Sequence, residues 1–295
     1  MESFFVPWRF KIMDAVFIIN PFSAKKNYKE FLEKLQQKYP EANFMISKSI
    51  EDTHRFIDEN FDSTEVFVAV GGDGTISTVA QKLINTDKIL AVFPAGSGNG
   101  FSNETNFTKN IDALLQKIKQ KKFHKIDTFT VNGNLSINVS GTGFDGEVIK
   151  KFEKTSRGFT NYIKVTVKTF FIFKSINIAF EDKYKQYDGN YLMLNVANTR
   201  QFGNNAYIAP HADYSDGLVD IVLVKKFPLW HSLAFAFRMF TKGLKENEYL
   251  TYFSVSDLKF TVKNSKAWHL DGEGIEIQSP VEIKVLPHSL NILVD

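Results

Sequence analysis

The chain has 295 residues, of which 43% are hydrophobic and 23% charged, and this composition excludes collagen-like, disordered and coiled-coil proteins. The absence of cysteine excludes disulfide frameworks, thiolate metal sites and cysteine nucleophiles, and predicts a reducing compartment such as the cytoplasm. A formal net charge of +3 is too small to indicate a nucleic-acid-binding surface, no apolar run is long enough for a membrane span, and residues 1–10 lack the pattern of a signal peptide.

The first part of the chain alternates short, β-rich apolar runs with helical stretches. The expected strands are 15–19, 44–46, 66–70 and 89–93, and the expected helices are 28–39, 52–60, 75–85 and 110–120. This alternation is typical of an open parallel α/β sheet with crossover helices. At roughly 150 residues per domain the length predicts two domains, and we assign 1–125 to the first. The leader Met1 to Met13, with several aromatic side chains, stays unassigned.

After Lys125 the sequence pattern changes to short runs with alternating apolar residues, separated by Asn-Gly, Asp-Gly and Gly-Asn turns. The expected strands lie in 128–139, 191–196, 218–224, 253–262, 276–277 with 281–285, and 290–294. This pattern predicts an antiparallel, β-rich second domain over 126–286.

Two helices, 159–173 and 229–244, interrupt the second domain. The second has an apolar stripe made of Trp230, Leu233, Phe237, Phe240 and Leu244. The simpler interpretation is that this stripe packs on the sheet. A lipid-facing or membrane-surface role is the alternative.

A strand, a glycine turn and a helix follow one another at Glu65 to Thr75. Gly71, Gly72 and Gly74 permit close approach of the backbone to a ligand, and the amides that begin the next helix favour an anion such as phosphate. We expect Thr75 to cap that helix. Because Asp73 would repel a phosphate unless a divalent cation intervened, it favours Mg²⁺ bound with the phosphate. A plain Asp-Gly turn is the alternative.

A second glycine turn strengthens the phosphate interpretation. The strand 89–93 leads into Pro94 to Gly100, and Asn20 to Ser23 follows the first strand. All three turns would lie at the carboxyl ends of parallel strands, where open α/β sheets bind ligands. Neither glycine turn matches the P-loop or the dinucleotide-binding pattern.

Together these residues resemble the diacylglycerol kinase catalytic fold, which includes bacterial diacylglycerol and lipid kinases and the sphingosine and ceramide kinases. The motifs occur in the family's order at Asn20-Pro21 to Ser23, Gly71 to Thr75, Gly96 to Asn99, Asn138 to Asp145, Asp213 to Asp220, and Asp271-Gly272-Glu273. NAD kinases and phosphofructokinases have a similar Gly-Gly-Asp-Gly turn, so the downstream acids favour this family.

The resemblance implies an ATP-dependent lipid kinase that binds its nucleotide on the first domain and its lipid in a β-sandwich-like second domain, with the active site in the interdomain cleft. It also implies that residues 287–295 return to the first domain. The nucleotide-binding residues it implies are Asn20, Pro21, Phe22, Ser23, Ala24, Ser47, Gly71, Gly72, Asp73, Gly74, Thr75, Ile76, Ser77, Ser97, Gly98 and Asn99. A solvent-facing loop serine is the alternative for Ser47. Two residues depart from the family pattern: Ala24 replaces a glycine, and Gly100 stands where many bacterial members have an acid.

The two acidic clusters have ordinary β-turns as their alternatives. The first departs from the EF-hand calcium-loop pattern. By resemblance, Asp213 and Asp216 with the backbone carbonyl of Leu218 hold a structural Mg²⁺, and oxygen ligands suit that ion. Asp271 would be the general base that takes the proton from the lipid hydroxyl, and Glu273 would be oriented toward the metal network.

The acceptor is left open between diacylglycerol and a sphingoid or ceramide-like lipid. Asp145 or Glu147 lies close to where sphingosine kinases have an acid for the amino head group, and would pair with an ammonium; an exposed, solvated acid is the alternative. We expect a peripheral membrane surface as partner and no nucleic acid, and leave a homodimer open. The rival functions are an NAD kinase and a non-catalytic lipid-binding protein on the same scaffold.

Overall fold

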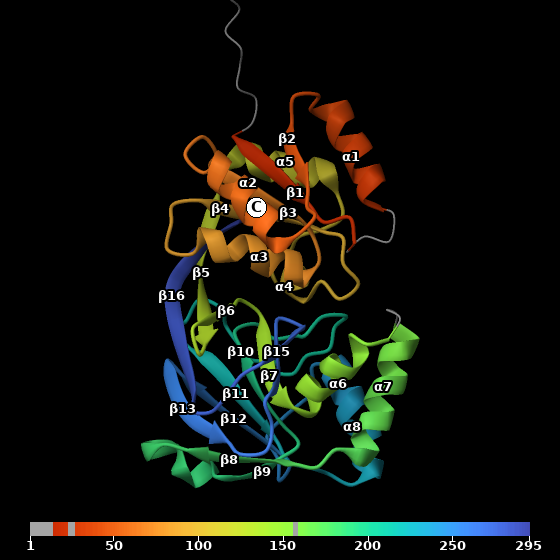
Figure 1. Ribbon diagram of the computed structural model, residues 1–295, viewed down its shortest axis with the longest axis vertical. Helices are drawn as coiled ribbons and strands as arrows, with labels where there is room; N and C mark the ends of the chain where they lie inside the picture. Colours follow the sequence, from red (N-terminus) through yellow and green to blue (C-terminus); the bar gives the residue numbers. More distant parts are fainter. Residues whose placement is uncertain (1–13, 23–26, 156–158) are drawn as a thin grey trace, which may run out of the picture.

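The computed structural model describes residues 14–22, 27–155 and 159–295. The leader Met1 to Met13 and two predicted nucleotide-binding residues, Ser23 and Ala24, lie outside the described residues. The molecule has two parts, stacked along its long axis (Figure 1).

The first part is a parallel α/β sheet, as predicted, with strand order β2-β1-β3-β4. Its elements are β1 (Ala15–Ile19), α1 (Asn27–Lys38), β2 (Asn43–Ile46), α2 (Ile50–Asn60), β3 (Val66–Gly71), α3 (Asp73–Leu83), β4 (Ile89–Pro94), α4 (Gly100–Glu104) and α5 (Ile111–Gln120). Side chains begin two of the helices: Ser49 accepts the N–H of Asp52, and Asn110 accepts those of Asp112 and Ala113. These caps satisfy amides that have no partner within the helix.

The second part is antiparallel and β-rich, as predicted. Its elements are β5 (Phe123–Val131), β6 (Asn134–Ser136), β7 (Val139–Gly143), α6 (Phe144–Phe152), α7 (Phe159–Ile172), β8 (Ile176–Phe180), the 3₁₀ helix η1 (Asp182–Tyr187), β9 (Gly189–Tyr191), β10 (Met193–Ala197), β11 (Val219–Val224), α8 (Leu229–Phe240), β12 (Leu250–Val255), β13 (Asp257–Val262), β14 (Ala267–Leu270), β15 (Glu273–Glu276) and β16 (Val281–Leu293). One sheet has the order β12-β11-β10-β7-β14-β15, and β8, β9, β13 and the first half of β16 belong to the other.

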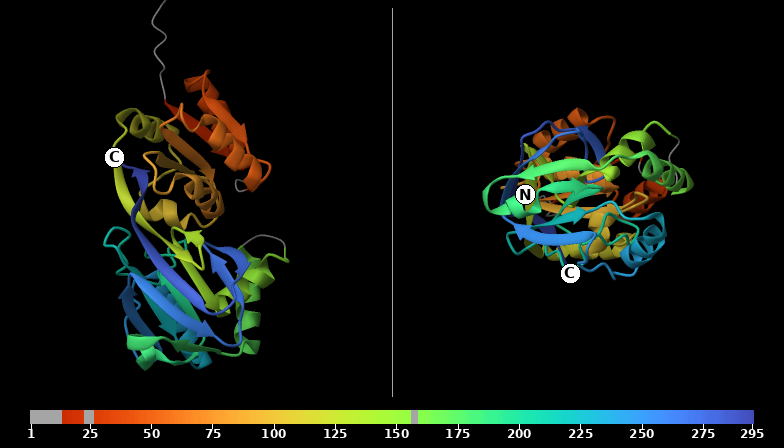
Figure 2. Two further views of the ribbon diagram at one scale, coloured as in Figure 1. Left: turned by 60° about the vertical axis from the view of Figure 1, so that its left-hand side comes forward. Right: turned by 90° about the horizontal axis from the view of Figure 1, so that it is seen from below.

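The two parts share their longest strands. β16 pairs with β13 at its beginning and, through Asn291 and Ile292, runs parallel to β4 at its end. β5 is antiparallel to β16 from Phe123 to Val131. Both strands run from one part to the other (Figures 1 and 2). The last strand therefore completes the sheet of the first part.

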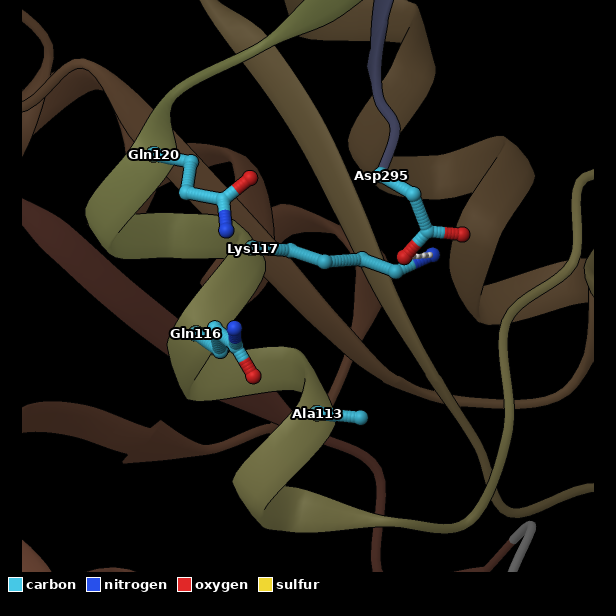
Figure 3. A pocket seen from close by; sticks show the side chains of 5 residues that line it. All are labelled: Ala113, Gln116, Lys117, Gln120 and Asp295. Atoms are coloured by element: carbon cyan, nitrogen blue, oxygen red, sulfur yellow. Dashed lines mark ion pairs between the residues drawn. The ribbon is translucent and has the colours of Figure 1, made fainter.

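The chain ends on the outside of the first part. Lys117 on α5 forms an ion pair of 3.1 Å with the Asp295 side chain. Figure 3 shows the pocket of about 280 Å³ beside it, lined by α5 and Asp295. Its lining contains none of the predicted site residues.

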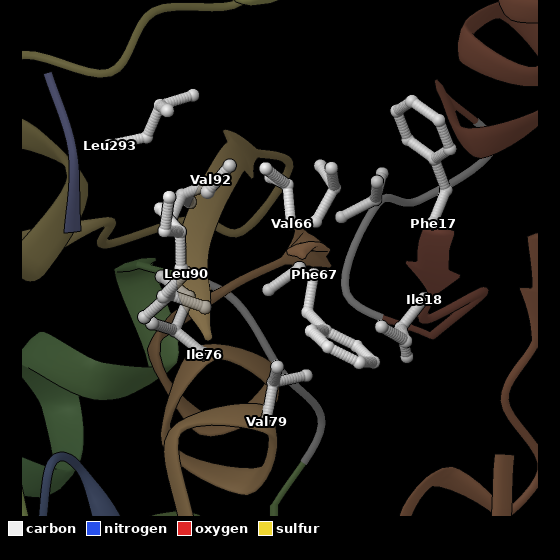
Figure 4. Packing of buried hydrophobic residues seen from close by; sticks show 14 of the residues in the cluster. Phe17, Ile18, Val66, Phe67, Ile76, Val79, Leu90, Val92 and Leu293 are labelled. Carbon is white, nitrogen blue, oxygen red and sulfur yellow. The ribbon is translucent and has the colours of Figure 1, made fainter. Parts of the chain in front are cut away.

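Three apolar cores stabilise the molecule. The first surrounds the parallel sheet and includes Phe17, Phe67, Leu90 and, from β16, Leu293 (Figure 4). The second contains side chains from both sheets of the second part, such as Phe260 and Trp268, which is the packing of a β-sandwich. The third lies between the six-stranded sheet and the helices α7 and α8.

Several sequence-based expectations about the elements differ from the structure. The run 253–262 is two strands, because the chain passes from one sheet to the other at Ser256. The runs 281–285 and 290–294 form one strand, with a register shift between Leu286 and Leu290. The residues just after Gly143 form the helix α6, which we did not expect.

The prediction that the stripe of the second helix packs on the sheet is wrong. α8 ends at Phe240, and Trp230, Leu233, Phe237 and Phe240 are exposed. Leu244, beyond the end of the helix, is buried. The helix contacts the third core through Phe235 and Met239 instead. The helical period of apolar residues shows that one face of a helix is apolar, but it does not show which face packs against the rest of the protein.

Candidate active site

The turns after β1, β2 and β3 meet at one edge of the parallel sheet. The amide of Asn20 donates to the Val70 carbonyl at 3.0 Å, and its side-chain Nδ2 donates to Thr75 Oγ1 at 2.9 Å. The Ser47 amide donates to the Ile19 carbonyl at 2.8 Å. Nucleotide-binding candidates that are far apart in sequence are therefore neighbours at the carboxyl ends of the strands, where ligands of such sheets bind.

The two glycine turns touch each other through their backbones. The amide of Gly96 donates to the Gly71 carbonyl at 3.2 Å, and a Cβ on Gly96 would lie 2.6 Å from Gly72 Cα. Only a residue without a side chain fits at such a distance. The glycines thus serve the packing of one turn on the other, which leaves backbone amides at the start of α3.

Asp73 has a role that we did not expect. Its two carboxylate oxygens accept the amides of Gly100 and Phe101, each at 3.1 Å, so Asp73 holds the first turn of α4. Burial raises the pKa of Asp73 to about 6, with a smaller contribution from the nearby Asp271 carboxylate. These amides are a second reason for an acid in this turn; because the pKa stays raised, they offset only part of the cost of burying the carboxylate, and the expected cation stays a prediction.

Two other residues of this turn also differ from expectation. The cap of α3 is Gly72, with no side-chain hydrogen bond, and Thr75 lies inside the helix. Ile76 is fully buried in the first core and its amide donates to the Gly72 carbonyl, so neither group can contact a nucleotide. We remove Ile76 from the predicted site.

The remaining nucleotide candidates differ in accessibility. Phe22 is exposed, with its amide bonded to Asn20 Oδ1 at 2.9 Å, and Ser97 is exposed. Ser47 is half-buried against Thr53, their hydroxyl oxygens 2.7 Å apart. Both interpretations of Ser47, a nucleotide contact and a loop serine, are compatible with this position. Asn99 adopts a left-handed conformation with φ of 50°, and its Oδ1 is buried without a hydrogen-bond partner among the described residues.

The Asp271 carboxylate is buried at the junction of the two parts. It accepts the Ser136 hydroxyl at 2.6 Å, the Asn138 amide at 2.9 Å and the Ile137 amide at 3.1 Å. Ser77 on α3 also lowers the pKa of this carboxylate. Burial raises the pKa of Asp271, and this effect exceeds that of the donors, which lower it. Asp271 thus faces the helix that begins at the glycine turn.

The backbone that presents Asp271 is held by His269. Asp271 has φ of 51° and Gly272 of 89°, a conformation that favours a short turn. The Gly272 amide donates to His269 Nδ1 at 3.4 Å, so the ring proton lies on Nε2, which is 3.2 Å from Asp145 Oδ2. Nothing in the local sequence pattern distinguished His269, because its partners lie on other elements.

Glu273 also reaches the first part. A Cβ on Gly74 would lie 2.4 Å from Glu273 Oε1, which places this carboxylate beside the start of α3. The turn between β14 and β15 therefore brings both acids of the Asp271-Gly272-Glu273 motif to the glycine turn after β3.

A seam of polar contacts aligns the two parts around these residues. Asn99 forms a β-bridge with Gly203, and the Asn204 amide donates to the Gly98 carbonyl at 3.1 Å. Glu104 is buried and accepts Arg200 Nε at 2.8 Å. The sequence analysis missed Arg200 and Ser136, because only the tertiary structure brings them to the site.

The two aspartates among the metal candidates accept amides of their own turns. The Asp213 carboxylate accepts the Ser215 amide at 3.0 Å, and that of Asp216 accepts the Leu218 amide at 2.9 Å. Both aspartates are exposed. Within the described ranges, no group of three or more His, Cys, Asp or Glu residues is placed to hold a metal ion. The expected set of Asp213, Asp216 and the Leu218 carbonyl has only two carboxylates, so it stays a prediction, as does the orientation of Glu273 toward it.

The two candidate head-group acids already have partners. Asp145 accepts the Asn195 side-chain amide and the Gly146 amide, in addition to its contact with His269. Glu147 forms an ion pair of 3.2 Å with Lys151, one turn along α6. Neither is a solitary solvated acid, and a substrate ammonium would compete with these contacts.

Comparison with known proteins identifies relatives of both parts. Residues 14–131 match the diacylglycerol kinase catalytic domain, and residues 138–294 match the YegS C-terminal NAD kinase beta sandwich-like domain. A diacylglycerol kinase of Bacillus subtilis is 25% identical over 278 residues, 88% of this chain and 89% of that protein. An uncharacterized protein of Synechocystis is 29% identical over 264 residues, 84% of this chain but 58% of that protein's length.

Solved structures share the fold. A crystal structure of a diacylglycerol kinase from Bacillus anthracis superposes with a TM-score of 0.72 at 18% identity, over 95% of this chain and 96% of that one. At this identity the similarity shows the fold alone.

Proposed function

We propose that this chain, which belongs to the diacylglycerol kinase catalytic domain family, is a lipid kinase that transfers the γ-phosphoryl group of ATP to the hydroxyl group of a lipid. The observation that carries the proposal is the position of the Asp271-Gly272-Glu273 turn. Ser77 on α3 is near enough to Asp271 to lower its pKa, and Glu273 lies beside Gly74. Two carboxylates from the end of the chain thus meet the glycine turn after β3.

The glycine turns and the turn after β1 are suited to the triphosphate. Amides at the start of α3 favour an anion, and the buried Oδ1 of Asn99 has no hydrogen-bond partner among the described residues, so it would accept a donor from a bound ligand. We assign ATP to Asn20, Ser47, Gly72, Gly74 and Ser97. Pro21, Phe22, Gly71, Asp73, Thr75, Ser77, Gly98 and Asn99 shape or border the same site.

We assign the general-base role to Asp271. In the transfer, the bond from the γ-phosphorus to the bridging oxygen of ADP breaks, the lipid oxygen bonds to that phosphorus, and Asp271 takes the lipid proton. A raised pKa makes this carboxylate a stronger base than an ordinary aspartate. Phosphoryl transfer depends chiefly on positioning the reactants and on neutralising the charge of the phosphates. The alignment of the two domains would supply the positioning, and the amides at the start of α3 would neutralise part of the charge.

ATP implies Mg²⁺, which neutralises phosphate charge in such transfers. Asp213, Asp216 and the Leu218 carbonyl offer oxygen ligands only, and these suit Mg²⁺. We retain them as candidate ligands of a structural ion, with Glu273 oriented toward the metal network. The substrate is diacylglycerol or a sphingoid or ceramide-like lipid, and we place the protein in the cytoplasm at a membrane surface.

The test is a panel of lipid acceptors with radiolabelled ATP. We expect label in a lipid product, and we expect Asp271→Asn to lower kcat by about 10² or more while the Kd for ATP changes less than threefold. Turnover of Asp271→Asn near that of the native chain would refute the base.

An NAD kinase is the second candidate, because the second part matches a domain described as NAD kinase beta sandwich-like. Including NAD in the panel distinguishes the two: label in NAD and in no lipid would replace the lipid kinase. Lipid binding without ATP consumption at any Mg²⁺ concentration would favour the non-catalytic alternative.

A further inference from the structure

The outer faces of α7 and α8 expose several large apolar side chains. On α7, Val167 and Phe171 are one turn apart, and Phe171 is 62% exposed. On α8, Trp230, Leu233 and Phe237 follow one stripe and are 75%, 80% and 69% exposed. We call these five side chains, with the two helices, the α7–α8 face.

The two helices form one continuous support. The ring of Phe227, which precedes α8, packs 5.7 Å from Phe170 of α7 and 5.1 Å from Phe235 of α8. Lys226 Nζ donates to the Phe173 carbonyl just beyond α7 at 2.9 Å. Both helices lie on the same side of the second part (Figures 1 and 2). Their inner faces are fixed on the third core, so their outer faces are presented together.

The charge on these elements has one sign. Residues 159–174 contain three lysines, and residues 225–245 contain four lysines and one arginine, with no Asp or Glu in either segment. The first acid beyond them, Glu246, accepts the Tyr252 amide of β12 at 3.1 Å. Apolar side chains flanked by cations are the chemistry of a surface that binds an anionic lipid bilayer.

We propose that the α7–α8 face docks on the surface of an anionic bilayer, with the apolar side chains inserted between head groups and the cations beside lipid phosphates. The docking would give the proposed lipid kinase access to its acceptor. This role of the docking rests on the proposed function, whereas the docking itself does not. A second copy of the chain is a poorer occupant, because a two-fold contact would set the same cationic elements against each other. Among the described residues no helix is long and apolar enough to cross a membrane, so the helices would lie on the bilayer.

The experiment measures binding of the full chain, without ATP, to sucrose-loaded vesicles by sedimentation. One set contains phosphatidylcholine with 30% phosphatidylglycerol, and the other contains phosphatidylcholine alone. We expect at least tenfold stronger binding to the anionic vesicles. The double variant Leu233→Ser, Phe237→Ser should lose at least tenfold in affinity, and Lys164→Glu, Lys168→Glu should lose most of the preference for anionic lipid, since each cation near the surface is worth about fivefold.

Matched controls separate docking from general effects. Ile50 on α2 is also exposed, at 56%, and Ile50→Ser should bind as the native chain does. Lys263→Glu, Lys266→Glu removes two exposed lysines of the second part and should retain binding. Unchanged circular dichroism verifies folding of each variant.

Three results would overturn the proposal: equal binding to both vesicle types, undiminished binding by the Leu233, Phe237 variant, or a native dimer that this variant dissociates. Because the assay contains no ATP, its outcome is independent of the kinase proposal. A chain that docks but labels no lipid refutes the kinase alone.

Discussion

Glu273 Oε1 occupies the space that a side chain at Gly74 would need, because a Cβ on Gly74 would lie 2.4 Å from it. The first residues of α3 and the turn between β14 and β15 are separated by about 200 residues in sequence, yet the absence of one methyl group lets them meet. The contact joins the proposed phosphate-binding turn to the acid motif at the end of the chain.

Gly74→Ala should separate activity from stability. Alanine within a helix is favoured over glycine by about 0.5 to 1 kcal/mol, and the atom in its way is the end of a flexible side chain, so the melting temperature should stay the same or rise. Displacement of the Glu273 carboxylate should lower kcat/KM roughly tenfold, about 1.4 kcal/mol of transition-state stabilisation. Thermal unfolding and steady-state kinetics measure the two effects, and a variant with full activity would show that the position of Glu273 is unimportant.

The close approach of the two glycine turns predicts a difference between neighbouring glycines. A Cβ on Gly96 would lie 2.6 Å from Gly72 Cα, whereas the nearest atom to a Cβ on Gly98 is Asp73 Oδ2 at 3.6 Å, an ordinary contact. Gly96→Ala should push the turns apart and weaken binding of a non-hydrolysable ATP analogue at least tenfold. Gly98→Ala is the matched control, and calorimetry should give it a Kd within about threefold of the native value. Equal affinities for the two variants would argue against a nucleotide site formed by the contact of these turns.

The elements of the parallel sheet could be predicted because their signals are local. The apolar run of β1, for instance, is bounded by polar residues, and its predicted limits agree with the structure. β16 could not be predicted as one strand, because the register shift between Leu286 and Leu290 interrupts its alternation. For α8 the helical period predicted the apolar stripe correctly. It could not predict that the opposite face is buried, because that face packs against Phe227 and the third core.

The candidate site, too, could be predicted from the sequence only in part. The sequence indicated the acids and glycines, since these residue types have characteristic chemistry at strand ends. It could not indicate what they contact: Asp73 accepts amides 27 residues away, and Asp271 accepts a hydroxyl 135 residues away. Asp73 therefore indicated a cation, and nothing in the sequence indicated that its carboxylate also binds the amides that begin α4.

The hydroxyl of Ser136 predicts a change in the pH profile. Proton abstraction needs the Asp271 carboxylate, so kcat/KM should fall as the pH drops through its raised pKa. Ser136 donates to Asp271 and so lowers that pKa. Ser136→Ala should consequently move the acidic limb of the profile to higher pH.

Ser140 provides the control for this shift. Its hydroxyl donates to Ser136 Oγ at 2.7 Å, and among the described residues it makes no hydrogen bond to the Asp271 carboxylate. Ser140→Ala should move the acidic limb less than Ser136→Ala does. An acidic limb at the native position in Ser136→Ala would mean that Asp271 is not the group whose protonation stops turnover.

Asp73 predicts a pH dependence of stability. Its pKa is raised to about 6 in the folded chain from 3.8, so the folded state binds this proton more tightly than the unfolded state does. Protonation of Asp73 therefore adds at most about 3 kcal/mol to the free energy of unfolding below about pH 4. This contribution is lost as the pH rises to about 6. The unfolding free energy of the native chain minus that of Asp73→Asn should therefore decrease between pH 4.5 and 7. Urea unfolding across this range measures it, and a difference that increases with pH would give Asp73 a lowered pKa instead.

Glu104 predicts how strongly the two parts depend on their polar seam. Its side chain is 2% exposed and accepts Arg200 Nε at 2.8 Å and Gln201 Nε2 at 2.7 Å. Glu104→Ala leaves these donors without their acceptor and should lower the unfolding free energy by about 2 to 4 kcal/mol. The loss should stay below the full cost of an unpaired buried charge, because Arg200 is 41% exposed and water can solvate it. Glu30→Ala, which breaks the exposed pair with Lys34 on α1, is the control and should cost much less, because an exposed ion pair contributes little to stability. Because Asn99 and Gly203 meet across the same seam, kcat/KM of Glu104→Ala should also fall at temperatures where the variant is folded. Denaturant unfolding and kinetics at such a temperature measure both effects, and a variant as stable and active as Glu30→Ala would mean that β5 and β16 alone align the two parts.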